Sequence, residues 1–222
     1  MKYQGVIFDF NGTLFWDTPL HNRAWDNFLK VHGIKLTDTE KNEKIHGKTN
    51  QDILSNIFNI NLSDEEVFSL ILEKETIYHD LCLESEMKLA EGAIDFFEFL
   101  IKSCIPFTIA TASGKENIVF YFEYFKLEKW FSFDHIVYND GTFRGKPSPD
   151  IFLIAANKLK TDPQKIIVFE DSISGIKAAE NAGVGKIVIV NSNKENYSNW
   201  SHTVITTFKD FDKSMFAKVN CT

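Results

Sequence analysis

Polar residues that suit a metal or phosphate site follow several short apolar runs in this chain. They are Asp9, Thr111, Lys146 and the neighbouring pair Glu170 and Asp171. Carboxylate oxygens suit Mg²⁺, which combines a few of them with phosphate oxygens and water. A lysine supplies a compact positive charge for phosphoryl oxygens. Together these residues predict a site for a divalent cation and a phosphorylated ligand, if the fold brings them together.

The elements expected around these residues place them at one edge of a sheet. We expect strands at residues 3–8, 107–110, 135–138, 166–170 and 186–190, with single helices between them from residue 93 onward. Strands separated by single helices form a parallel sheet that is covered on both faces. The carboxyl ends of parallel strands share one edge, where open α/β folds bind their ligands. The sequence therefore predicts an α/β, Rossmann-like core with helices on both faces.

A purely helical insertion is expected after the first strand. Helices are predicted from Thr18 to about Gly33, over 49–58, and from Ser63 to about Leu83, where Ser63-x-x-Glu66 forms a capping box. No convincing strand pattern lies between residues 16 and 89. We therefore expect residues 16–89 to form an all-α cap domain, and residues 1–15 with 90–222 to form the core.

Composition and charge narrow the possible partners and compartment. The net charge of −7 argues against a broad basic surface for nucleic acid. No apolar run approaches the roughly 20 residues that a membrane span needs. The three widely spaced cysteines, without a C-x-x-C motif, predict reduced thiols in a cytoplasmic protein. We expect a monomer whose partner is a small metabolite, with neither nucleic acid nor membrane involved.

Four motifs resemble those of the haloacid dehalogenase-like superfamily. They are DFNGTL at 9–14, TAS at 111–113, GKPSPDIF at 145–152, and FEDS at 169–172 followed by Gly175. They occur in the right order and span almost the whole chain. The helical insertion and the stretch from Asp17 to Trp25 are similar to the β-phosphoglucomutase and sugar-phosphatase branch.

The resemblance implies a nucleophile and a metal site. Asp9 would attack phosphorus and form an aspartyl-phosphate, which divides one difficult hydrolysis into two steps. Mg²⁺ would be held by the Asp9 carboxylate, the backbone carbonyl of Asn11 and Asp171, with Glu170 behind them or acting through water. The cation would offset the repulsion between the nucleophile and the phosphate.

The resemblance also implies groups that hold the transferring phosphoryl oxygens. These are Thr111, Lys146 and free backbone amides near Gly12 and Ala112, with Ser113 beside them. Preorganised donors of this kind usually supply the largest catalytic effect. The function expected is a Mg²⁺-dependent phosphohydrolase of small phosphorylated metabolites, with sugar phosphates favoured. The alternatives are a phosphomutase and a catalytically silent protein that binds a phosphorylated ligand.

One position departs from the pattern of the superfamily. Its phosphatases and mutases carry an aspartate two residues after the nucleophile, which moves the proton of the leaving group and of water, whereas this chain has Asn11. General acid–base catalysis is worth roughly 10²–10⁴ in rate. The enzyme could act on phosphates whose leaving group needs no proton, or an acid such as His21 could supply the proton. The asparagine could instead be an introduced substitution, or deamidation of Asn11-Gly12 could restore an aspartate. Finally, the protein could have lost catalysis and kept phosphate binding. The sequence leaves these alternatives open.

Several residues in and near the cap have both a functional and an ordinary interpretation. His21 matches a histidine that approaches the site in the phosphoglucomutase-like branch, or is a helix histidine with a structural hydrogen bond. Lys48 lies in a loop similar to one that binds a sugar phosphate, although we favour a solvated lysine, and Asn50 replaces the arginine of the mutases. Lys74 could line the cleft, but we expect it at the surface of a long helix. The aromatic run 120–125 is expected to pack a helix rather than to form a platform for a ligand.

Overall fold

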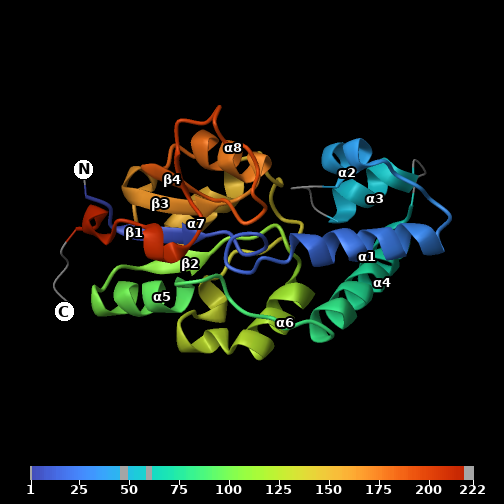
Figure 1. Ribbon diagram of the computed structural model, residues 1–222, viewed down its shortest axis with the longest axis horizontal. Helices are drawn as coiled ribbons and strands as arrows, with labels where there is room; N and C mark the ends of the chain where they lie inside the picture. The colour runs from blue at the N-terminus through green and yellow to red at the C-terminus, as the bar shows by residue number, and fades with distance from the viewer. Residues whose placement is uncertain (1, 46–49, 59–61, 218–222) are drawn as a thin grey trace. The chain divides into compact units, whose positions relative to one another are not determined.

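The computed structural model describes residues 2–45, 50–58 and 62–217, and the chain divides into two compact units (Figure 1). The core unit comprises Met1–Trp16 and Lys88–Thr222. The cap unit comprises Asp17–Met87 and is inserted after the first strand. Each unit has its own apolar interior, so each is described by itself.

The core unit contains a five-stranded parallel sheet, as the sequence predicts. The strand order is β2-β1-β3-β4-β5. In β1, Phe8 is paired with Ile109 of β2 on one side and Phe169 of β3 on the other. The segment that carries Asp9 therefore leaves the middle of the sheet at its carboxyl edge. The strands are β1 (Gly5–Phe8), β2 (Phe107–Ile109), β3 (Ile166–Glu170), β4 (Lys186–Val190) and β5 (Thr203–Ile205).

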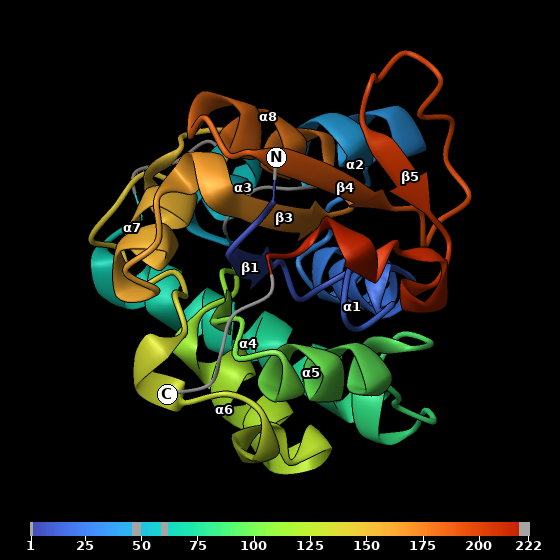
Figure 2. The same ribbon diagram turned by 90° about the vertical axis from the view of Figure 1, so that its left-hand side faces the viewer.

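Helices cover both faces of the sheet, and each face has a different interior (Figure 2). Successive residues of a strand point to opposite faces. Ile7 and Val168 pack in an aliphatic cluster with residues of α7 and α8, whereas Phe8 and Phe169 stack at 5.2 Å in an aromatic cluster with Phe96 of α5. The core helices are α5 (Ala93–Lys102), α6 (Lys115–Phe125), α7 (Asp150–Lys158) and α8 (Ile173–Asn181).

The prediction of a strand at 135–138 is wrong. Residues Phe133–His135 form a 3₁₀ helix, and Val137 makes only an isolated parallel bridge to Ala110. The sequence analysis also missed β5, a three-residue strand with one buried side chain, Ile205. A single buried side chain among three residues gives no alternating pattern that could be recognised. The other 3₁₀ helices are Leu127–Lys129, Pro163–Lys165, Phe208–Asp210 and Lys213–Met215.

Among the residues that the structure describes, the cap unit contains helices and no strand. Trp25, Phe28 and Leu54 lie in its apolar core, and Phe28 is fully buried. The predicted capping box is present, because Ser63 and Glu66 satisfy each other's backbone N–H groups. A second capping box, which the sequence analysis missed, begins the short helix α2. The cap helices are α1 (Thr18–Val31), α2 (Asp38–Lys44), α3 (Asn50–Phe58) and α4 (Asp64–Leu83).

The cysteines do not all follow the expectation of reduced thiols. Cys82 is a free thiol, and burial raises its pKa to about 12, so it is not a thiolate at neutral pH. Cys104 is disulfide-bonded, which contradicts the expectation. Among the described residues, no helix has both the length and the apolar character that crossing a membrane requires.

Candidate active site at the carboxyl edge of the sheet

Asp9 lies at the centre of a charged cluster where β1 ends. Its backbone N–H donates to the Phe169 carbonyl at 2.9 Å, which continues the pairing with β3 one residue past the strand. The residue is 5% exposed, and the Lys146 ammonium lies 2.5 Å from Oδ1. The Asp9 carboxylate is therefore held by the Lys146 charge at the carboxyl edge of the sheet, where open α/β folds bind their ligands.

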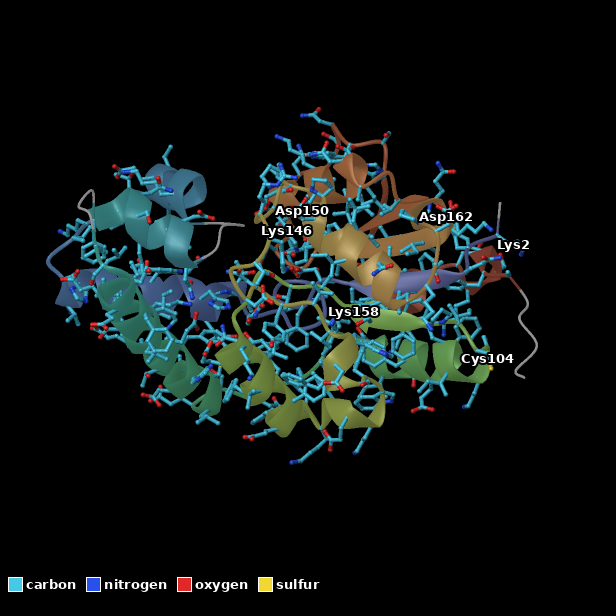
Figure 3. The ribbon with its side chains drawn as sticks, turned by 180° about the vertical axis from the view of Figure 1, so that it is seen from behind. Lys2, Cys104, Lys146, Asp150, Lys158 and Asp162 are labelled. Carbon is cyan, nitrogen blue, oxygen red and sulfur yellow. The ribbon has the colours of Figure 1, made fainter. Side chains whose placement is uncertain are left out.

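Lys146 reaches this edge from the loop before α7, where Figure 3 labels it together with Asp150. The exposed Arg144 guanidinium binds Asp150 through two nitrogens, which closes the loop on either side of Lys146. The ammonium donates to both Asp9 and Glu170. Burial lowers the pKa of Lys146, but these two carboxylates outweigh that effect and raise it above its usual value. Lys146 is therefore a permanent cation.

Glu170, the last residue of β3, is fully buried and acts as a framework for the site. Oε1 accepts from Lys146, and Oε2 accepts from the backbone N–H and the hydroxyl of Ser172, which also caps α8. A Cβ atom at Gly175 would lie 1.7 Å from Glu170 Oε1. The glycine of the fourth motif is therefore required by the close approach of α8 to this carboxylate.

Asp171 faces the first motif from the turn after β3. Its Oδ1 accepts from the Thr13 hydroxyl at 3.2 Å, and a Cβ atom at Gly12 would lie 2.0 Å from its Oδ2. On the other side of the turn, the hydroxyl of Tyr197 donates to the Asp171 carbonyl at 2.5 Å. The sequence analysis missed Tyr197, because nothing in the segment after β4 indicates that it folds back to this edge.

The residues at this edge fit a divalent cation. Asp9, Glu170 and Asp171 each offer an oxygen within 4.8 Å of the others. Burial first, and then the charges of Glu170 and Asp9, raise the pKa of Asp171 well above its usual value. One lysine does not balance three carboxylates, so a cation would relieve a repulsion that is already present. The backbone bridge from residue 11 to Phe15 uses the Gly12 N–H and the Phe10 carbonyl.

The second motif contacts the side chain of Asn11. The Ser113 hydroxyl donates to Asn11 Oδ1 at 2.7 Å, and the Thr111 hydroxyl lies 3.4 Å from the same oxygen. At the other end, Asn11 Nδ2 donates to the hydroxyl of Tyr121 at 2.7 Å. Tyr121 is fully buried and stacks on Phe10, so the aromatic run packs its helix as predicted. The contact of its hydroxyl with Asn11 was missed, because a tyrosine among phenylalanines gives no separate signal.

The backbone N–H groups near Gly12 and Ala112 were both expected to donate to phosphoryl oxygens. The Gly12 N–H donates to the Phe15 carbonyl at 2.7 Å. This contradicts the expectation that it would be free to donate to a phosphoryl oxygen. Ala112 lies half-buried in the turn between Thr111 and Ser113. The turn is closed by the Ser113 N–H, which donates to Thr111 Oγ1 at 3.2 Å.

The cap unit holds a buried polar network of its own. His21 stacks on Tyr78, contacts Asp17 at 3.3 Å, and lies 3.3 Å from the ammonium of Lys74. Lys74 is 1% exposed and pairs with Glu75 at 2.9 Å, which corrects the expectation of a surface lysine. The pattern of the helix predicted an exposed side chain. In the structure the Lys74 ammonium instead lies over the rings of two aromatic residues of the cap.

Asn50 also belongs to this network. Its side-chain N–H donates to Glu75 Oε1 at 2.5 Å, so the residue that replaces an arginine makes a contact within the cap. Burial would raise the pKa of Glu75, but the charges of Lys74 and then His21 lower it to about 2. Lys48, the other candidate in this loop, lies outside the described residues.

Comparison with known proteins agrees with the resemblance of the four motifs. The sequence matches the haloacid dehalogenase-like hydrolase family over residues 6–189. It is 30% identical to a phosphorylated carbohydrates phosphatase of Thermotoga maritima, covering 83% of each chain, and 29% identical to the fructose-1-phosphate phosphatase YqaB of Escherichia coli, covering 84% of this chain and 96% of that one. A solved hydrolase of family IA, variant 3, from Entamoeba histolytica is 39% identical, covers 97% of both chains and superposes with a TM-score of 0.85. The chain belongs to the haloacid dehalogenase-like hydrolases.

Proposed function

We propose that the protein is a Mg²⁺-dependent phosphatase of small phosphorylated metabolites, with sugar phosphates as the first candidates. The observation that carries this proposal is the position of Asp9, which Lys146 holds at the carboxyl edge while Glu170 and Asp171 offer oxygens within 4.8 Å. The named phosphatases among its relatives support the substrate class, since two of them act on phosphorylated carbohydrates.

Each charged residue of the cluster has a distinct role in this proposal. Asp9 attacks the phosphorus and becomes an aspartyl-phosphate, which water then hydrolyses. Lys146 stays protonated and neutralises charge on the transferring oxygens. Asp9, Asp171 and the Asn11 carbonyl would hold Mg²⁺, with Glu170 behind them. When bound, the cation lowers the repulsion between the carboxylate nucleophile and the phosphate.

The second motif would hold the substrate next to the nucleophile. Thr111 and Ser113 place their hydroxyls beside Asn11, and the turn that contains Ala112 lies between them. Both hydroxyls donate to Asn11 Oδ1 in this structure, so each would have to turn from Asn11 to donate to a phosphoryl oxygen. His21 and Lys48 of the cap stay candidate contacts for the rest of the metabolite.

Asn11 is the observation that favours a second function, a silent binding protein for a phosphorylated ligand. The amide cannot shuttle a proton at neutral pH, while the nucleophile and the carboxylates are intact. A phosphomutase is less well supported, because Asn50 donates to Glu75 inside the cap where the mutases carry an arginine.

The wider expectations about partners and compartment also stay proposals. The net charge of −7 supports a small-molecule partner over nucleic acid, and we propose a monomer. The cytoplasm stays the proposed compartment, although the disulfide at Cys104 counts against it.

A phosphatase assay with matched aspartate variants tests the proposal. Sugar phosphates and 4-nitrophenyl phosphate are incubated with Mg²⁺ or with EDTA. We expect Mg²⁺-dependent release of phosphate that Asp9→Asn abolishes and that Asp134→Asn, a change at an exposed aspartate of the core, leaves unchanged. Turnover by Asp9→Asn near that of the wild type would overturn the assignment of the nucleophile.

Asn11→Asp separates a weak phosphatase from a binding protein. The variant should speed the first step with sugar phosphates by about 10²–10⁴, because an alkoxide leaves slowly without a proton. Binding of sugar phosphates without turnover in either variant would favour the silent binding protein.

A further inference from the structure

The side chain of Asn11 is held at both ends, by the buried Tyr121 and by the half-buried Ser113. Nδ2 donates to Tyr121 and Oδ1 accepts from Ser113, both at 2.7 Å. Tyr121 cannot move aside easily, since it is fully buried and its ring lies 4.4 Å from that of Phe10. The amide therefore occupies the place of a proton-transfer group, in a rigid frame, with no basic atom.

The carboxylates at this edge are already engaged in holding the site together. Glu170 uses Oε1 for Lys146 and Oε2 for Ser172. Asp171 accepts from Thr13 and belongs to the set that would bind the cation. The Lys146 ammonium donates to both Asp9 and Glu170.

The two histidines of the core unit lie elsewhere. His202 contacts Glu180 near the end of α8, at the opposite end of the helix from Ser172. His135 is exposed, and its carbonyl accepts the hydroxyl of Thr108 in the middle of β2. In the described part of the core unit, these contacts hold both histidines away from the position of Asn11.

The missing base affects the two chemical steps unequally. With an acyl or aryl phosphate, an Asp9 oxygen forms a bond to phosphorus while the bond from phosphorus to the leaving oxygen breaks. The leaving group takes the electron pair as a carboxylate or phenolate, which is stable without a proton. In the second step water attacks the aspartyl-phosphate, releases inorganic phosphate and regenerates the Asp9 carboxylate. That water must lose a proton, and a positioned base contributes roughly 10²–10⁴ to such a step.

We propose that this chain stores a phosphoryl group at Asp9, accepting it from acyl or aryl phosphates and retaining it because Asn11 does not activate water. The inference rests on the proposed function, since it requires Asp9 to be the nucleophile. It adds a stable phosphorylated form of the protein, whose lifetime is set by the residue at position 11.

The test measures the adduct directly. The full chain is incubated with Mg²⁺ and either acetyl phosphate or 4-nitrophenyl phosphate, the donor is removed, and intact mass follows the protein over time. We expect nearly all of the wild type to gain one phosphoryl group and to lose it slowly. Asn11→Asp should lose the group about 10²–10⁴ times faster. Asp9→Asn should gain none.

The outcomes distinguish a failure of the inference from a failure of the proposed function. Continuous rapid turnover of 4-nitrophenyl phosphate without an adduct in the wild type would refute storage and leave the phosphatase standing. Equal lifetimes in the wild type and in Asn11→Asp would refute the role of Asn11. A short lifetime that His21→Asn lengthens would show that the cap supplies the base, which also refutes it. Neither adduct nor turnover in any variant would overturn both.

Discussion

Alanine at Gly12 should weaken both the fold and the metal site. The residue has a φ of +78°, and an added Cβ would lie 2.0 Å from Asp171 Oδ2. Alanine in the left-handed region costs about 1–2 kcal/mol, of which about 0.4–1 kcal/mol is recovered because the unfolded chain is less free. The Thr13 hydroxyl donates to the Asp171 carboxylate, and the Tyr197 hydroxyl holds the backbone carbonyl of the same residue. The carboxylate therefore cannot turn aside freely, and overpacking adds about 1–3 kcal/mol.

Gly141 offers a matched control for the backbone contribution alone. Its φ is +79°, and a Cβ there would meet nothing within 4 Å. A protein of this size loses about 2–4 °C in Tm per kcal/mol. Gly141→Ala should therefore lower Tm by at most about 6 °C, for a net loss of about 0–1.6 kcal/mol. Gly12→Ala should lower it by several degrees more.

Thermal denaturation and Mg²⁺ titration together test this reasoning. Because Asp171 is displaced in Gly12→Ala, its Kd for Mg²⁺ should rise by about 10–100-fold, as when the support of a metal ligand is removed. Gly141→Ala should bind Mg²⁺ like the wild type. If Gly12→Ala were as stable as Gly141→Ala and bound Mg²⁺ equally well, Asp171 would not pack against Gly12 as described.

Three further predictions concern charge and chemistry. The raised pKa of Asp171 stabilises the metal-free protein at acidic pH, and this contribution is lost as the pH rises through that pKa. The Tm measured in EDTA should therefore decrease as the pH is raised. Excess Mg²⁺ or the substitution Asp171→Asn should remove this decrease. Lys74→Met should destabilise the cap by about 3–5 kcal/mol in urea denaturation, because Glu75 stays buried and charged. The double variant Lys74→Met with Glu75→Leu should recover most of that stability. An unchanged stability of the single variant would contradict the buried pair. Asn11 should deamidate more slowly in the folded protein than in urea, because the Gly12 N–H that must attack it donates to Phe15; equal rates by peptide mass spectrometry would contradict this.

The sequence predicts residues at strand ends better than residues that fold back to them. Asp9 and Glu170 follow or end strands of continuous apolar residues, so their shared edge follows from the geometry of a parallel sheet. Tyr121 and Tyr197 reach the same edge from a helix and from an irregular segment. Their positions depend on tertiary packing, for which a single sequence has no local pattern.

The same limit explains the errors in the secondary structure and the cap. The run His135–Tyr138 has apolar residues typical of a strand, but only Val137 pairs with the sheet. Lys74 has the sequence of a surface lysine, and only the folded cap shows that aromatic rings and Glu75 cover it. Burial of a charge depends on partners from other helices, which the periodicity of one helix does not reveal.

The central place of β1 bears on the order in which the molecule assembles. Its neighbours β2 and β3 both come after the cap in the chain, so every contact of this strand within the sheet is distant in sequence. Each doubling of a closing loop adds only about 0.6 kcal/mol to its entropic cost, so the insertion is tolerated at equilibrium. Distant pairing is nevertheless slow, and Asp9 meets Glu170 only after β1 has joined β3. We therefore expect the carboxylates to come together late in folding, so that Mg²⁺ slows unfolding of the core while leaving its folding rate nearly unchanged.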